Sequence, residues 1–266
     1  MKHVNPKPKT LKRAAKYRFL ILVFPVFLLL LGPIFSGCKK SPSDNIEYSI
    51  GIDRSGSSRI NAMDSSDKVY AYLIRALNIS GNEFTNKGIK INLFRVGNSA
   101  RPVITTVTLP PSNGWIFSNT NKRKKETAQF KKKLKATIEE VMNVEANQST
   151  SQIYHALCFQ LHALKSSTFS TDKRLILLSD GLESSELANF VSYIDKIKQF
   201  KESFPDLRKK MAENCTLPDD LSDITIQMFN SPGLGATEIV LACDTYWSEL
   251  VAAHNGKISI FPNLPQ

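Results

Sequence analysis

The chain has 266 residues, and its 35 Lys and Arg against 24 Asp and Glu give a formal net charge of +11. Seven of the basic residues and none of the acidic ones lie in residues 1–37, so the remaining 28 basic and 24 acidic residues give the rest of the chain a net charge of only +4. The charge therefore does not indicate a nucleic-acid-binding protein, and we expect no nucleic-acid partner.

The first 37 residues have the pattern of a secretion signal, with a basic segment followed by a long apolar run from residue 19. The run closes with Phe-Ser-Gly-Cys at residues 35–38. Small residues directly before a cysteine resemble the lipobox of bacterial lipoproteins, although Phe35 replaces the usual Leu. The resemblance implies that Cys38 is lipidated and becomes the mature N-terminus; an uncleaved signal anchor is the alternative.

Either interpretation tethers the protein to a membrane of the bacterial cell envelope and places its folded part outside the cytoplasm. We divide the chain into a signal peptide at residues 1–37, a polar tether at 38–45 and one domain at 46–266. Three further cysteines, Cys158, Cys215 and Cys243, have no zinc-site spacing. We expect a disulfide between Cys215 and Cys243, with Cys158 as a small buried apolar residue.

The domain opens with an apolar strand, residues 46–52, that ends in Asp53-Arg-Ser55-Gly-Ser57. Residues at i, i+2 and i+4 of an extended segment point to the same side, so the Asp53 carboxylate and the hydroxyls of Ser55 and Ser57 can converge. Oxygen ligands of this kind suit Mg²⁺, with positions left open for water or a ligand. An ordinary capped turn before a helix is the alternative.

Strands and helices then alternate along the chain. We expect helices at residues 66–81, in the basic stretch from 121 to about 141, around residues 153–164, and at 184–200 and 236–254. We expect strands at 88–96, 103–109 (an edge strand), 173–179, 224–229 and 257–261. Residues 201–223 form an irregular or partly helical insertion. This order predicts an α/β fold with a doubly wound, mostly parallel sheet and helices on both faces.

In such a sheet, ligands bind beyond the carboxyl ends of the strands. Asp53, Ser151 and Asp180 all follow strands or precede helices at that edge. Taken singly, each has a purely structural explanation, because Asp180 can cap a turn with Gly181 and Ser151 can cap the helix that holds Ile153.

The basic helix carries clusters at residues 122–125 and 131–135. A solvated helix face explains these lysines, and an anionic partner such as a lipid headgroup or an acidic polymer is the alternative.

Three segments together resemble the von Willebrand factor type A domain, whose metal-ion-dependent adhesion site is built from such pieces. They are Asp53-Arg-Ser55-Gly-Ser57, the hydroxyl residues before Ile153-Tyr-His-Ala-Leu157, and Leu-Ile-Leu-Leu-Ser-Asp180-Gly181. The resemblance covers about residues 46–255. It implies a Rossmann-like fold and a bound Mg²⁺ or Mn²⁺ ion whose coordination is completed by an acidic group from a partner.

Carried over residue by residue, Asp53, Ser55 and Ser57 match the first motif and Asp180 the last. The second motif is less clear, because Ser151 stands where the family usually has Thr and the actual threonine, Thr150, is one residue earlier. Either hydroxyl suits a cation. Glu183 is expected to be a helix N-terminal acid, with a position in the site as the alternative.

We therefore expect a membrane-tethered, non-enzymatic module that binds a protein or another acidic ligand through a divalent cation. The alternative is a metal-independent scaffold subunit of an envelope complex. An enzyme is not expected, since the chain has no GxSxG, GxxxxGK[ST] or HExxH motif, and His155 and His162 belong to no recognisable catalytic arrangement.

Overall fold

The computed structural model describes residues 45–53, 65–80, 85–97, 103–112, 120–143, 150–230 and 237–262. The expected signal peptide, Cys38, Ser55 and Ser57 lie outside these residues. Pro42–Gln266 forms a compact unit of its own. Within the described ranges, none of the helices combines the length and the apolar character needed to cross a membrane.

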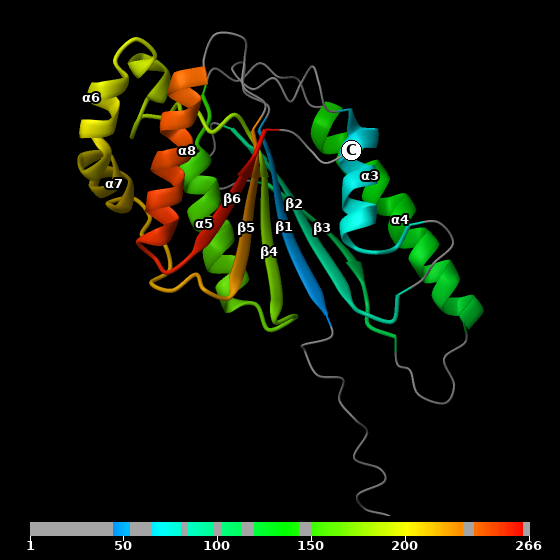
Figure 1. Ribbon diagram of the computed structural model, residues 1–266. Helices are drawn as coiled ribbons and strands as arrows, with labels where there is room; N and C mark the ends of the chain where they lie inside the picture. Colours follow the sequence, from blue (N-terminus) through cyan, green and yellow to red (C-terminus); the bar gives the residue numbers. More distant parts are fainter. Residues whose placement is uncertain are drawn as a thin grey trace, which may run out of the picture. The chain divides into compact units, whose positions relative to one another are not determined.

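A six-stranded sheet with the order β3-β2-β1-β4-β5-β6 forms the centre of this unit (Figure 1). Its strands are β1 (Ile46–Asp53), β2 (Ile89–Val96), β3 (Ile104–Leu109), β4 (Asp172–Leu178), β5 (Ile224–Phe229) and β6 (Lys257–Phe261). All neighbours are parallel except β3, which pairs antiparallel with β2 at the edge. This is the strand order of the doubly wound Rossmann sheet, and it confirms the predicted fold class.

Helices cover both faces of the sheet, and each face has its own apolar core. One face is covered by α3 (Ser66–Ala76) and α4 (Thr120–Asn143), and the other by α5 (Ile153–Ser166) and α8 (Thr237–Ala252). Three short helices add to the second face: η3 (Phe190–Tyr193), α6 (Ile197–Glu202) and α7 (Phe204–Ala212). Because central parallel strands are covered on both sides, all eight residues of β1 are buried.

Alternation along β1 decides which face receives its polar residues. Tyr48, Ile50 and Ile52 belong to the core beneath α3 and α4. Ser49 points to the opposite face, where its hydroxyl donates to Gln160 Oε1 of α5 at 2.6 Å. Asp53, four residues further on, is therefore presented on the α5 side of the sheet.

The prediction of a helix at residues 184–200 is wrong. Ser184 instead pairs with Ser151 and with Asn189 in isolated bridges, and helical structure begins only at η3. The reason is local: the Ser185 hydroxyl accepts hydrogen bonds from the backbone N–H groups of Leu187 and Ala188, both at 3.3 Å. Such bonds offer the backbone an alternative to the helix.

Candidate functional site

The Asp53 carboxylate lies at the carboxyl end of β1 and is completely buried. Two hydroxyls from distant parts of the chain donate to the same oxygen, Oδ2: Ser151 Oγ at 2.9 Å and Ser179 Oγ at 2.7 Å. Both serines are themselves completely buried. The sheet therefore brings oxygen atoms from three separate segments together at one edge.

Ser151 is held in place by backbone hydrogen bonds on both sides. Its N–H donates to Ser184 O at 2.8 Å, and Ser184 N–H donates back to Ser151 O at 2.9 Å. The next residue, Gln152, donates its N–H to Gly97 O at 3.1 Å, just beyond the end of β2. The segment before α5 is thus tied to the loops that follow β2 and β4, and this fixes the Ser151 hydroxyl on Asp53.

Asp180 follows Ser179 directly, at the carboxyl end of β4. Its Oδ1 accepts a hydrogen bond from Leu182 N at 3.0 Å, which makes an Asx turn. The turn places Gly181 at a φ of 76°, in the left-handed region that favours glycine. Trp247 Nε1 of α8 donates to Gly181 O at 2.9 Å and so holds the turn against α8.

Glu183 lies next to this group and has a different role. Gln152, the N-cap residue of α5, makes no side-chain cap hydrogen bond, and Glu183 Oε2 accepts from Tyr154 N at 2.8 Å instead. Complete burial is the main reason that the pKa of Glu183 rises to about 7, hydrogen bonds to its carboxylate limit the rise, and the nearby Asp53 contributes a smaller increase. The expectation of a helix N-terminal acid holds, but the helix is α5 and not one that follows Glu183.

These donors fit a hard divalent cation. Asp53 and Asp180 extend from neighbouring parallel strands, β1 and β4, and Ser151 adds a hydroxyl. Asp53, Asp180 and Glu183 are all at most 2 % exposed, and burial in a low-dielectric interior disfavours the negative charge of each carboxylate. A bound cation would compensate those charges, and oxygen-only ligands suit Mg²⁺ or Mn²⁺.

The sequence left open whether Thr150 or Ser151 supplies a hydroxyl, and the two residues differ in their contact with Asp53. The hydroxyl in contact with Asp53 belongs to Ser151, while Thr150 is the half-buried residue before it. Sequence reasoning missed Ser179. Its signal was strand alternation, because Leu175, Leu177 and Ser179 share the face of β4 that packs against α5.

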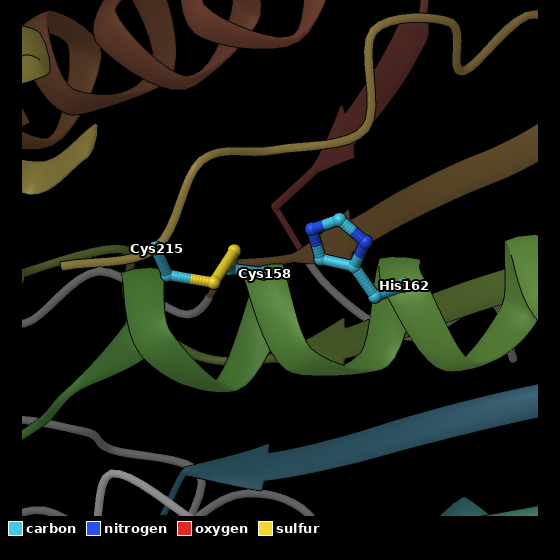
Figure 2. A group of neighbouring side chains, drawn as sticks. All are labelled: Cys158, His162 and Cys215. Atoms are coloured by element: carbon cyan, nitrogen blue, oxygen red, sulfur yellow. A yellow bond between two sulfur atoms is a disulfide. The ribbon is translucent and has the colours of Figure 1, made fainter. Parts of the chain in front are cut away.

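A second cluster of side chains lies around Cys158, at the middle of α5 (Figure 2). Cys158 forms a disulfide with Cys215 there. The expected pairing of Cys215 with Cys243 is wrong: Cys243 lies on α8 with its thiol buried in the core, whereas Cys215 follows α7 and has its Cα 6.3 Å from that of Cys158. His162 is the third member, with Nε2 2.7 Å from Thr216 O. Both sulfurs are bonded to each other, so this group offers no thiolate to a metal.

No protein-family model and no curated protein match this chain. Among solved structures, it is similar to human Sec24c, a COPII-coat protein, with 12 % identity, a TM-score of 0.42 and coverage of 84 % of this chain and 30 % of that one. Proximal thread matrix protein 1 from the mussel byssus, with a zinc-occupied MIDAS motif, gives 13 % identity, a TM-score of 0.38 and coverage of 84 % and 43 %.

The manganese-loaded TRAP protein of Plasmodium vivax gives 11 % identity and a TM-score of 0.35, with coverage of 82 % of this chain and 68 % of that one. The chain spans less than half the length of Sec24c and of proximal thread matrix protein 1. Similarity at this level does not assign the chain to a family, and the fold class rests on the strand order of its own sheet.

Proposed function

We propose that this chain is a membrane-tethered binding module, without enzymatic activity, that recognises a protein or another acidic ligand through a divalent cation. Asp53, Ser151 and Asp180 would hold the cation, together with Ser55 and Ser57 of the first motif. Mg²⁺ or Mn²⁺ would supply an electrophilic centre there that accepts a carboxylate from the partner.

The convergence on Asp53 is the observation that supports this function. Two buried hydroxyls fix the orientation of its carboxylate, and Asp180 ends the neighbouring strand. Satisfied hydrogen bonds around a candidate ligand are the usual means by which a protein orients a metal ligand. The tether is supported by the sequence alone, through the basic and apolar segments that precede Cys38.

Calorimetry tests the cation site. The fragment Pro42–Gln266 is titrated with MgCl₂ and, separately, MnCl₂, and compared with its Asp53→Asn variant, which keeps the size of the side chain and removes its charge. We expect saturable binding by the wild type and a loss of at least tenfold in affinity for the variant. Asp219→Asn, at an exposed acid outside the site, is the matched control and should bind normally. Identical heats for wild type and Asp53→Asn would contradict the proposal.

Affinity purification from membranes tests the partner. The full chain is captured in Mg²⁺ and then washed with a chelator. A module that binds through a cation releases its partners in chelator. Partners that stay bound would instead identify a metal-independent scaffold in an envelope complex.

A further inference from the structure

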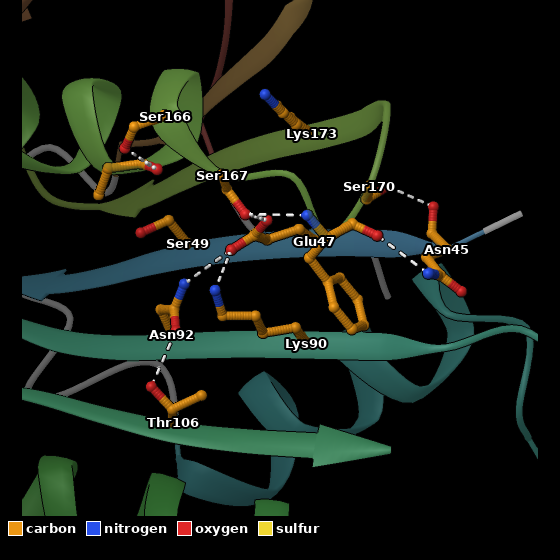
Figure 3. Close-up of polar contacts among 12 residues, drawn as sticks. Asn45, Glu47, Ser49, Lys90, Asn92, Thr106, Ser166, Ser167, Ser170 and Lys173 are labelled. Carbon is orange, nitrogen blue, oxygen red and sulfur yellow. Dashed lines mark hydrogen bonds and ion pairs between the residues drawn. The ribbon is translucent and has the colours of Figure 1, made fainter. Parts of the chain in front are cut away.

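The polypeptide enters the domain at the amino end of β1, and its entry point is fixed. The Asn45 side chain donates from Nδ2 to Phe169 O at 2.9 Å and accepts at Oδ1 from Gly88 N at 3.0 Å, while the Ser170 hydroxyl donates to Asn45 O (Figure 3). Asn45 is thus bonded to the segments before β2 and before β4. Both segments lie opposite Asp53, at the edge where the parallel strands begin, which we call the amino edge of the sheet.

The segment before β4 is itself anchored to β1. Glu47 is 1 % exposed, and its carboxylate accepts from the Ser167 hydroxyl and from Asn92 Nδ2, and pairs with Lys90 Nζ at 2.7 Å (Figure 3). A buried carboxylate with several partners holds one geometry. The amino edge of the sheet is therefore a rigid platform, and the preceding tether starts from a defined point on it.

A groove of about 880 Å³ opens at this same edge, and Ile46, the first residue of β1, lines it. Its basic residues are Lys87 and Lys124, both exposed, and Arg174. Its acidic residue, Asp172, is engaged by Arg174 through bonds of 2.8 Å from Nε and 2.9 Å from Nη2. The groove thus carries an excess of positive charge.

Arg123 explains why lysines face outward here. Its guanidinium is buried and donates to three backbone carbonyls: Thr85 O at 2.6 Å, Pro110 O at 2.7 Å and Lys87 O at 2.8 Å. These bonds fix the first turns of α4 against the segment before β2. Lys124 is consequently held at the groove, and the Lys125 side chain next to it is exposed.

The tether relates this groove to the membrane. Cys38 lies seven residues before Asn45 in the sequence. Seven residues span at most about 25 Å when fully extended. If Cys38 carries a lipid, as the proposed function requires, the amino edge stays close to the headgroups of the anchoring membrane, whereas Asp53 lies at the far end of β1.

We propose that the groove lined by Lys87, Lys124 and Arg174 binds the phosphate of anionic phospholipid headgroups in the membrane that holds the tether. Lysine ammonium groups act as point charges for phosphate, so Lys87 and Lys124 supply the binding charge, whereas the Arg174 guanidinium stays paired with Asp172 in the wall of the groove. Occupation of the groove orients the domain with its amino edge on the membrane. The inference rests on the tether of the proposed function but not on its cation site.

Vesicle sedimentation tests this proposal on the fragment Pro42–Gln266, which lacks Cys38, in the presence of chelator. Vesicles of phosphatidylcholine with about one third phosphatidylglycerol should bind the fragment, and pure phosphatidylcholine vesicles should not. The double variant Lys87→Gln/Lys124→Gln should bind at least tenfold more weakly, since each basic residue near an anionic surface contributes a factor of about five. Circular dichroism shows whether the variant is folded.

Lys132→Gln/Lys133→Gln is the matched control, because both lysines are exposed on α4 and outside the groove. It removes the same charge and should lose no more than about threefold in binding. Equal losses in the two double variants would show a diffuse charge effect and overturn the proposed groove. Displacement of the fragment from the vesicles by millimolar inorganic phosphate would show that the groove does not prefer headgroups to free phosphate, and would also overturn the proposal. Asp53→Asn should leave vesicle binding unchanged, so failure of the cation site and failure of the groove are separate results.

Discussion

At the scale of single residues, the candidate site depends on hydrogen bonds that its sequence motifs do not predict. Within the described residues, the Ser179 hydroxyl lies closer to Asp53 Oδ2 than the Ser151 hydroxyl does, at 2.7 Å against 2.9 Å. It points to the α5 face because it continues the alternation of β4. A residue of this kind orients a candidate ligand through a hydrogen bond to its carboxylate.

Ser179→Ala should weaken Mg²⁺ or Mn²⁺ binding about tenfold or more, since the Asp53 carboxylate loses one of the groups that orient it. The cost to the free energy of unfolding should be about 1 kcal/mol. Calorimetric titration and urea denaturation measure the two effects. Ser192→Ala, at an exposed hydroxyl on η3 that bonds only to Asn189 O in the described structure, should change neither. A normal cation affinity for Ser179→Ala would remove the serine from the site.

Glu183 should make the metal-free domain sensitive to pH. Burial raises its pKa from the ordinary 4.5 to about 7, so the folded state binds this proton more tightly than the unfolded state does. The resulting stability is fully present below pH 4.5 and is lost as the pH rises through 7. In chelator, raising the pH from 5 to 8 should cost up to about 3 kcal/mol through this group.

Glu183→Gln removes the titration and keeps an oxygen acceptor for Tyr154 N. The difference in urea midpoint between pH 5 and pH 8 should therefore be smaller in the variant than in the wild type. Equal pH dependence in the two proteins would show that Glu183 stays ionised in the folded state.

At the scale of secondary-structure elements, the sequence predicted the segments with a strong apolar period and failed where side chains bond to their own backbone. β1, β2, β4 and β5 lie where alternation or an apolar run placed them, and the Thr-rich strand β3 is at the edge. Residues 184–196 have apolar residues at helical spacing, but Ser184 forms isolated bridges with Ser151 and Asn189, and the Ser185 hydroxyl closes a turn instead.

The same limit applies to the site and to the disulfide. Asp53, Ser151 and Asp180 were predictable because parallel strands end at one edge. The Glu183 bond to α5 depends on how the loop after β4 packs against the start of α5, and the pairing of Cys158 with Cys215 depends on how the segment after α7 packs over the same helix. No periodicity encodes either contact.

Reduction of the Cys158–Cys215 disulfide should destabilise the domain by about 2–4 kcal/mol, since the bond closes a loop of 57 residues in the unfolded chain. Guanidinium denaturation with and without a dithiol reductant measures this difference. The Cys158→Ser/Cys215→Ser variant is the control, because reductant should not change its stability. An unchanged midpoint for the wild type would contradict the bond's contribution to stability.

At the scale of the whole domain, the candidate cation site and the entry of the tether occupy opposite edges of one sheet. β1 connects them directly, with Asn45 before its first residue and Asp53 as its last. Eight residues of extended chain span about 26 Å. A domain held to a membrane through its amino edge would thus present the cation site away from the lipid, where a partner from solution can reach it.

Fluorescence quenching by spin-labelled lipids tests that orientation in the full chain reconstituted into vesicles. A probe at Thr171→Cys, exposed beside the amino end of β4, should be quenched several times more strongly than one at Pro262→Cys, exposed beyond the carboxyl end of β6. The native Cys243 thiol is buried and should not take the label. Quencher placed in the headgroup region reports an amino edge that rests on the membrane, because quenching falls steeply over the length of a strand. Similar quenching at both positions would mean that the tether leaves the domain free to rotate, and the cation site would then face the lipid as often as the solution.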